Sequence, residues 1–242
     1  MSRTKKGPGS GKRKREADDS DQVAKKSAQV KRAEEAEYDS TIASESPEEI
    51  AVRFTKSIQK HKGDLSTIEL EDQSVPLKAI RDTSGFKNPR NVQHLAEFLK
   101  QFASADELQK CELAASPHTL IVTAAAIRAT DIARPVREFG NEHNKIAKLF
   151  AKHMKLKETV EYVQKTRFGI GVGTPARIEG LISKNALKLD KLKLIVLDAS
   201  YVNVKKNTIF DDSDAFLQLL SLLNVEQLKL QLVSGQTEIL CF

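Results

Sequence analysis

The chain has 242 residues, of which 40% are hydrophobic and 30% charged, and its basic excess gives a formal net charge of +6. Two cysteines are too few for a disulfide framework or a cysteine-based zinc site, and no apolar run approaches the ~18 residues of a transmembrane helix. The N-terminus lacks the apolar stretch of a secretory signal. Aromatic residues make up 5% and Trp is absent, which argues against a large stacking platform for single-stranded nucleic acid. We therefore expect a protein of a reducing compartment, with no metal site and no membrane partner.

Residues 1–46 have the composition of a disordered tail, because they combine many charges with few apolar positions. Basic residues gather there in short clusters, which favours a nuclear localisation signal or an arm that contacts nucleic acid. A solvated basic tail that no receptor reads is the alternative. The residues of the expected localisation signal are Lys12, Arg13, Lys14, Arg15, Lys25 and Lys26.

Residues 47–110 are predicted to form an N-terminal helical segment. Ser46 followed by Pro47 and two acids is typical of a helix start, and this helix is expected to run to about residue 60. Residues 63–90 have no clear period and are expected to be a loop. A second helix is predicted to open near residue 88, because five apolar residues recur there at helical spacing: Val92, Leu95, Phe98, Leu99 and Phe102.

Residues 111–242 alternate short apolar runs with helical patterns. This alternation suits right-handed βαβ crossovers and predicts an α/β domain, an open and mainly parallel sheet flanked by helices. Strands are expected over residues 118–123, 145–151, 168–173, 192–197 and 237–242. Helices are expected over residues 125–139, 156–165 and 175–187, and again after Asp212.

The string from Gly173 to Arg177 lies at one of the predicted strand-to-helix junctions. Glycine permits a sharp turn, Thr174 is a helix cap and Pro175 suits the first helical turn. The free N–H groups of that helix start, with Arg177 one turn along, could hold a phosphate. A well-capped helix with a surface arginine is the alternative.

Three segments, in chain order, resemble motifs of a RecA-like DEAD-box helicase domain. The strand ending at Thr123 is followed by Arg128, which is all that is kept of the Pro-Thr-Arg-Glu-Leu motif. Residues 173–177 resemble the Thr-Pro-Gly-Arg motif with Ala for Gly, and Asp198 retains the first residue of Asp-Glu-Ala-Asp. In DEAD-box helicases the first two motifs contact the RNA backbone, and the third handles magnesium and the attacking water.

The parts needed for ATP hydrolysis are missing from the sequence. No GxxxxGK[ST] phosphate loop precedes Leu120, and Asp198 is followed by Ala199 and Ser200, so the second carboxylate is absent. We therefore expect no catalytic residue, no cofactor and no enzymatic activity, and we interpret Asp198 as a strand-end cap.

The segments 127–129, 148–153 and 170–178 look like those of the Cms-one family of nucleolar proteins. Members are described as subunits of the 90S pre-ribosome, or small-subunit processome, with a degenerate single-lobe DEAD-box domain. The resemblance implies a RecA-like (P-loop NTPase-like) domain over 111–242 and a nuclear, nucleolar location. It also implies partnership with pre-rRNA and processome assembly proteins, with no small-molecule substrate and no homo-oligomer. A nuclear regulator of DNA replication and the cell cycle is one alternative, and an ATP-dependent RNA helicase is another.

Positive charge concentrates in the same region: residues 143–206 hold 14 Lys or Arg against 5 Asp or Glu. An RNA-binding surface and a merely solvated lysine face both fit this pattern. Because the carboxyl ends of parallel strands share one edge, we expect Arg128 and Arg177 to be exposed close together there. The candidate RNA- or phosphate-binding residues are Arg128, Lys148, Lys152, Gly173, Thr174 and Arg177.

Overall fold

The computed structural model describes residues 36–151 and 154–242. Residues 37–242 form one compact unit, so the expected separate helical segment at 47–110 is not a domain of its own. The expectation of a disordered tail as far as residue 46 is also wrong for its last ten residues. These form strand β1 (Glu37–Tyr38) and the 3-10 helix η1 (Ser40–Ala43), in which Ile42 is buried. The six residues of the expected localisation signal, and Lys152, lie outside the described residues.

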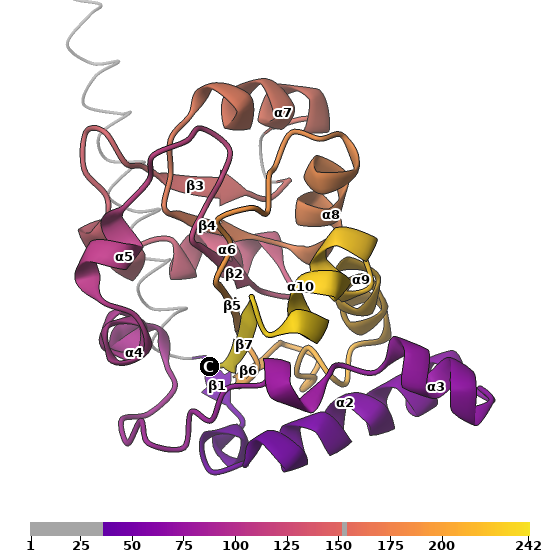
Figure 1. The fold of residues 1–242 in the computed structure, drawn as a ribbon. Coiled ribbons are helices and arrows are strands. Elements are labelled where there is room, and N and C mark those ends of the chain that lie inside the picture. Colours follow the sequence, from indigo (N-terminus) through magenta and orange to yellow (C-terminus); the bar gives the residue numbers. More distant parts are fainter. Residues whose placement is uncertain (1–35, 152–153) are drawn as a thin grey trace, which may run out of the picture. The chain divides into compact units, whose positions relative to one another are not determined.

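Five parallel strands form the main sheet, in the order β3-β4-β2-β5-β7, which Figure 1 shows from top to bottom. The prediction of a mainly parallel sheet is therefore confirmed. Every residue of β2, β4 and β5 is buried, as is typical of a parallel sheet covered on both faces. The strands are β2 (Thr119–Val122), β3 (Ile146–Leu149), β4 (Ile170–Gly173), β5 (Leu194–Leu197) and β7 (Glu238–Cys241).

Helices cover both faces of this sheet, and alternate strand residues supply two hydrophobic clusters. Figure 1 shows α4 and α5 on one side of the strands and α8, α9 and α10 on the other. The first cluster holds α2 (Pro47–Lys62), α7 (Leu156–Lys165), α8 (Pro175–Ser183), α9 (Ser213–Leu223) and α10 (Glu226–Ser234). The second holds α4 (Leu95–Phe102), α5 (Ala105–Gln109), α6 (Ala126–Ile132) and the 3-10 helix η4 (Pro135–Phe139).

Capping boxes start three of the helices, in which a serine and a glutamate three residues later satisfy each other's backbone N–H groups. One of them, α3 (Thr67–Gln73), lies in the stretch expected to be a loop, as does the 3-10 helix η2 (Leu77–Ala79). The helix α3 buries no residue, so it has no apolar stripe that periodicity could detect. The second predicted helix is found as the 3-10 helix η3 (Val92–His94) followed by α4.

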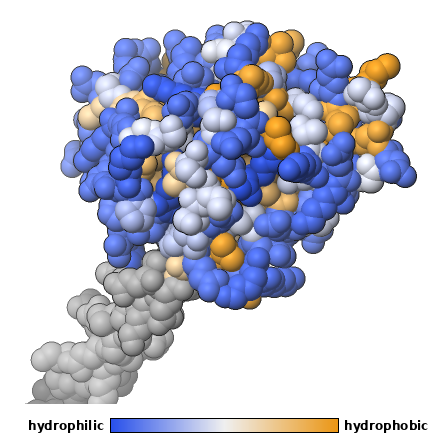
Figure 2. Space-filling view, turned by 90° about the horizontal axis from the view of Figure 1, so that it is seen from below, coloured by the Kyte–Doolittle hydropathy of each residue, from blue (hydrophilic) through white to orange (hydrophobic). Residues whose placement is uncertain are grey.

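The face formed by α2 and α3 is largely hydrophilic, as Figure 2 shows from below, with hydrophobic residues in small groups. Val52 and Ile68 are 50% and 80% exposed, and single exposed hydrophobic residues of this kind are ordinary. None of the described helices is both long and apolar enough to cross a membrane.

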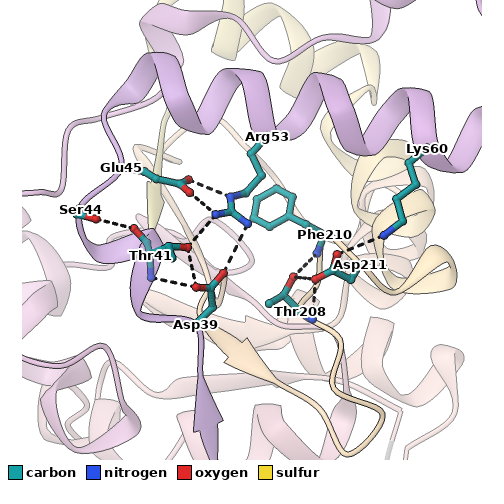
Figure 3. Close-up of polar contacts among 9 residues, drawn as sticks. All are labelled: Asp39, Thr41, Ser44, Glu45, Arg53, Lys60, Thr208, Phe210 and Asp211. Atoms are coloured by element: carbon teal, nitrogen blue, oxygen red, sulfur yellow. Dashed lines mark hydrogen bonds and ion pairs between the residues drawn. The ribbon is translucent and has the colours of Figure 1, made fainter.

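Residues 37–45, which we call the N-terminal strap, are fastened to α2 by Arg53 (Figure 3). The Arg53 guanidinium donates to the Glu45 carboxylate at 2.9 Å and to the Thr41 hydroxyl at 3.0 Å, and it lies 3.6 Å from the Asp39 carboxylate. The same group lies over the Phe210 ring, 5.7 Å from its centroid. The strap is thus held by charge-assisted contacts to a helix that packs in the core.

Gly173 generates a test of the packing between β3 and β4. A Cβ at this position would collide with the carbonyl oxygen and Cβ of Leu149. Gly173→Ala is therefore expected to lower the free energy of unfolding by about 1–3 kcal/mol, measured by urea denaturation. Gly180→Ala is the matched control, because its Cβ would meet only the Leu156 side chain, at 3.5 Å, within a helix that alanine favours. Equal stability of the two variants would contradict this packing.

Candidate functional site at the carboxyl edge of the sheet

The connections that leave the central strand β2 and its neighbours place a crevice at the carboxyl edge. From β2 the chain continues into α6 on one face, whereas β4 is followed by α8 and β5 by α9 on the other. In open α/β sheets, ligands bind at the point where connections diverge in this way. Here three polar side chains occupy that point: Thr123, Arg128 and Asp198.

Arg128 and Asp198 form a bidentate ion pair in this crevice. Nε of Arg128 donates to Oδ2 of Asp198 at 2.9 Å, and Nη2 donates to Oδ1 at 2.9 Å. The hydroxyl of Thr123 donates to the same carboxylate at 2.7 Å. Both charged side chains are only 1% exposed, so the pair lies in the interior of the protein.

Two tyrosines cover the guanidinium. Its carbon lies 4.3 Å from the ring centroid of Tyr201 and 5.3 Å from that of Tyr38, and Nη1 donates to the Tyr38 hydroxyl at 3.2 Å. Tyr201 belongs to β6 (Tyr201–Val202), which pairs antiparallel with β1 of the N-terminal strap. The strap therefore closes the crevice from above the ion pair.

Electrostatics keep Arg128 charged in this closed place. Burial disfavours the charged guanidinium, but the charge of Asp198 and its hydrogen bonds outweigh burial and raise the pKa of Arg128. The expectation that Arg128 is exposed is therefore wrong, because its donors are directed at Asp198 and Tyr38. Asp198 is the partner of this ion pair and not a strand-end cap.

A second buried arginine, Arg90, closes the neighbouring part of the edge, where a single bridge between Ile80 and Ile239 adds backbone beside β7. Arg90 is 4% exposed and donates to the carbonyl of Thr83 at 2.8 Å, to its hydroxyl at 2.9 Å and to the carbonyl of Cys241. Sequence reasoning missed Arg90, because Cys241 is 151 residues away in the chain and no local pattern joins them.

The residues of the Gly173–Arg177 string take different places from those expected. Thr174 is at the N-cap position of α8, but its side chain makes no capping hydrogen bond. Arg177 is half-buried and its Nη1 donates to the hydroxyl of Thr159 on α7 at 2.7 Å. Arg177 is therefore directed at α7, whereas Arg128 is directed at β5, and the two do not form a joint site.

Lys148 is exposed on β3, the strand at one end of the sheet order. It is in register with Val172, which belongs to the core on the α4 and α6 side, whereas α8 lies on the opposite face. The structure thus does not bring Lys148 and Arg177 to one face. Among the described residues, no group of three His, Cys, Asp or Glu side chains is placed to hold a metal ion.

The buried pair predicts a specific pattern of stability changes. Arg128→Met and Asp198→Asn should each lower the free energy of unfolding by about 3–5 kcal/mol, because each leaves an uncompensated or undersupplied buried partner. The double variant should lose clearly less than the sum of the two, as measured by chemical denaturation in a double-mutant cycle.

Arg177→Met is the matched control, with an expected cost of about 1 kcal/mol for one lost hydrogen bond. Strictly additive losses in the Arg128 and Asp198 cycle would show that the two side chains do not act as a pair.

Two solved structures are similar to part of the chain. One is a DEAD box protein from Methanococcus jannaschii, 18% identical with a TM-score of 0.38, over 64% of this chain and 37% of that one. The other is Saccharomyces cerevisiae Dbp5 bound to Nup159, Gle1, IP6 and ADP, 16% identical with a TM-score of 0.42, over 78% and 45%. The chain spans less than half the length of either structure.

Curated relatives match much more of the chain. Protein CMS1 of Chaetomium thermophilum is 41% identical over 178 residues, which cover 72% of this chain and 70% of that protein. Protein cms1 of Schizosaccharomyces pombe is 29% identical over 82% and 70%, and human protein CMSS1 is 31% identical over 67% and 57%.

A family model agrees with these relatives. The model, described as "CMS1: U3-containing 90S pre-ribosomal complex subunit", matches residues 1–242. The resemblance to the Cms-one family is thereby confirmed, and the chain belongs to the CMS1 family.

Proposed function

We propose that the chain is a non-catalytic subunit of the 90S pre-ribosome, the small-subunit processome, acting in the nucleolus. In this role it binds pre-rRNA, assembly proteins or both through a domain with the remains of helicase motifs. The observation that carries the proposal is the closed crevice, in which Arg128 and Asp198 satisfy each other beneath Tyr38 and Tyr201.

The closed crevice argues against ATP hydrolysis. That reaction needs a phosphate cradle, a carboxylate for magnesium and a group that orients the attacking water. Both Asp198 oxygens already accept hydrogen bonds, and Ala199 and Ser200 follow it where a second carboxylate would be required. The 242-residue sequence also has no GxxxxGK[ST] string. An interaction role fits these residues better than a helicase cycle.

Pre-rRNA is a suitable partner on charge grounds, because the chain carries a net charge of +6 and a strongly basic region at 143–206. Of the residues first considered, Lys148, Thr174 and Arg177 remain candidate contacts, as does Lys152. A nuclear regulator of replication and the cell cycle that acts by protein contacts is the alternative, and the proteins that co-purify with the chain would separate the two roles.

ATP should neither bind measurably nor be hydrolysed, with or without RNA. Isothermal titration with Mg-ATP and a phosphate-release assay would check this, and a DEAD-box helicase serves as the positive control. A magnesium-dependent ATPase rate in the purified protein would contradict the proposal. A folded Asp198→Asn variant that lost such a rate would assign it to this site.

Removing residues 1–35 should reduce nuclear accumulation, because the basic clusters from Lys12 to Lys26 are removed while Tyr38 and the strap remain. Fluorescence microscopy of tagged protein measures the effect, and an unchanged melting temperature shows that the folded unit is intact. Replacing only the six clustered Lys and Arg residues by Gln is the matched control for chain length. Full nuclear accumulation of both variants would show that entry depends on a partner.

A further inference from the structure

We infer that the amino edge of the sheet, opposite the closed crevice, is the surface that binds the RNA phosphate backbone. This inference rests on the proposed function, since it names the face through which the chain would bind pre-rRNA. The surface is made by the loops that precede β2, β3, β4 and β5. We call it the amino-edge surface and define it by residues 110–118, 140–145, 165–169 and 184–193.

The loop before β5 is the most basic part of the amino-edge surface. Its four lysines, Lys184, Lys188, Lys191 and Lys193, are all exposed, and Asp190 is its single acid. Several cations that project from one short loop create a local positive potential, which is the electrostatic requirement for binding a phosphate backbone.

The loops before β3 and β4 extend this charge. Lys145, Lys165 and Arg167 are exposed, and the backbone N–H of Lys145 donates to the carbonyl of Arg167 at 3.1 Å. The loops are tied together because parallel strands begin at the same edge of a sheet. The cations are therefore carried on one ordered surface and not on separate flexible segments.

Further backbone hydrogen bonds join the loop before β5 to the loop before β2. The N–H of Lys188 donates to the carbonyl of Ala115 at 2.8 Å, and that of Lys193 donates to the carbonyl of His118 at 2.9 Å. Ala115 in turn donates to the carbonyl of Thr166 at 3.1 Å, in the loop before β4. A chain of bonds thus runs through three of the basic loops.

Few carboxylates neutralise these cations. Within residues 36–151 and 154–242, the only ion pair formed by a cation of the amino-edge surface joins Lys110 to Glu112, at 3.0 Å. Glu142 and Asp190 are the other acids of these loops and form no such pair with the described residues. Most of the positive charge therefore remains available to an external anion.

A pocket of about 200 Å³ lies within this surface, lined on its basic side by Lys110, His118, Lys191 and Lys193. Ser116 also lines it, is 3% exposed and has a hydroxyl that finds no partner in the described part of the chain. A buried hydroxyl without a partner is costly, and a phosphate oxygen would satisfy it.

Two acids also line this pocket, but each is already engaged. Glu112 pairs with Lys110, and the Glu107 carboxylate accepts hydrogen bonds from the backbone N–H and hydroxyl of Ser104, at 2.9 and 2.8 Å. Burial lowers the pKa of His118, so its ring is neutral at pH 7 and adds a hydrogen-bonding group without a charge. The pocket is thus suited to one phosphate group of a longer backbone.

The carboxyl edge offers much less to a phosphate. Arg128 and Arg90 are 2% and 4% exposed, and their donors are directed at protein acceptors. Arg177 donates to Thr159, which leaves only part of its guanidinium for a ligand. The free positive charge of the folded unit therefore favours the amino edge.

Two variants that each remove three positive charges would test this inference. The amino-edge variant is Lys188→Gln, Lys191→Gln and Lys193→Gln, and the control is Lys148→Gln, Lys157→Gln and Arg177→Gln. Fluorescence anisotropy with a mixed-sequence single-stranded RNA of about 20 nucleotides, at several salt concentrations, gives the affinity and its salt dependence. Melting temperatures should match wild type, because all three amino-edge side chains are exposed.

Each single-strand phosphate contact contributes about 0.7 to the salt slope, so three lost contacts should lower the slope by about 2. At ~0.1 M salt this corresponds to roughly a hundredfold weaker binding by the amino-edge variant, with little change in the control. Loss of binding in the control alone would overturn the inference and leave RNA binding intact.

Two other results separate the inference from the proposed function. If wild type binds no RNA at any salt concentration, the RNA part of the proposed function fails together with the inference. If the amino-edge variant binds RNA like wild type but loses processome proteins on co-purification, the amino edge is a protein interface. That result would overturn the inference alone.

Discussion

The buried ion pair between Arg128 and Asp198 is the constraint on which the rest of this structure depends. A charged guanidinium that is 2% exposed is tolerated only because a carboxylate, a tyrosine hydroxyl and two aromatic rings meet it. These partners come from β5, β6 and the N-terminal strap, so one side chain joins three segments that lie far apart in the sequence. Arg53 fastens the strap at its other end.

This arrangement divides the two edges of a parallel sheet between two tasks. Open α/β sheets normally use the carboxyl edge for ligands, and here that edge is filled by Arg128, Asp198, Arg90 and the strap. The amino edge has no comparable cover, and its loops carry exposed lysines on a hydrogen-bonded frame. A domain with the remains of helicase motifs thus becomes suited to binding without turnover, which accords with a family described as pre-ribosomal subunits.

Local sequence patterns were sufficient for the sheet but not for the site. Runs such as Leu120–Val122 and Leu194–Leu197 predicted buried parallel strands, because a strand covered on both faces must be apolar throughout. Arg128 was recognised as special, yet its role was wrong, since a motif cannot show that Asp198, 70 residues later, takes up its donors. Tyr38 lay in a segment too polar to predict as folded, and its partners Arg128 and Tyr201 are remote in the chain.

Hydrogen exchange of the Arg128 Nε–H group, followed by NMR, tests the central claim most directly. The closed pair predicts a slowly exchanging Nε–H signal, because this donor is buried against the Asp198 carboxylate. The signal should keep its position and its slow exchange when Mg-ATP or RNA is added. Fast exchange in the free protein, or opening of the pair by either ligand, would contradict the account and return the carboxyl edge to the list of binding sites.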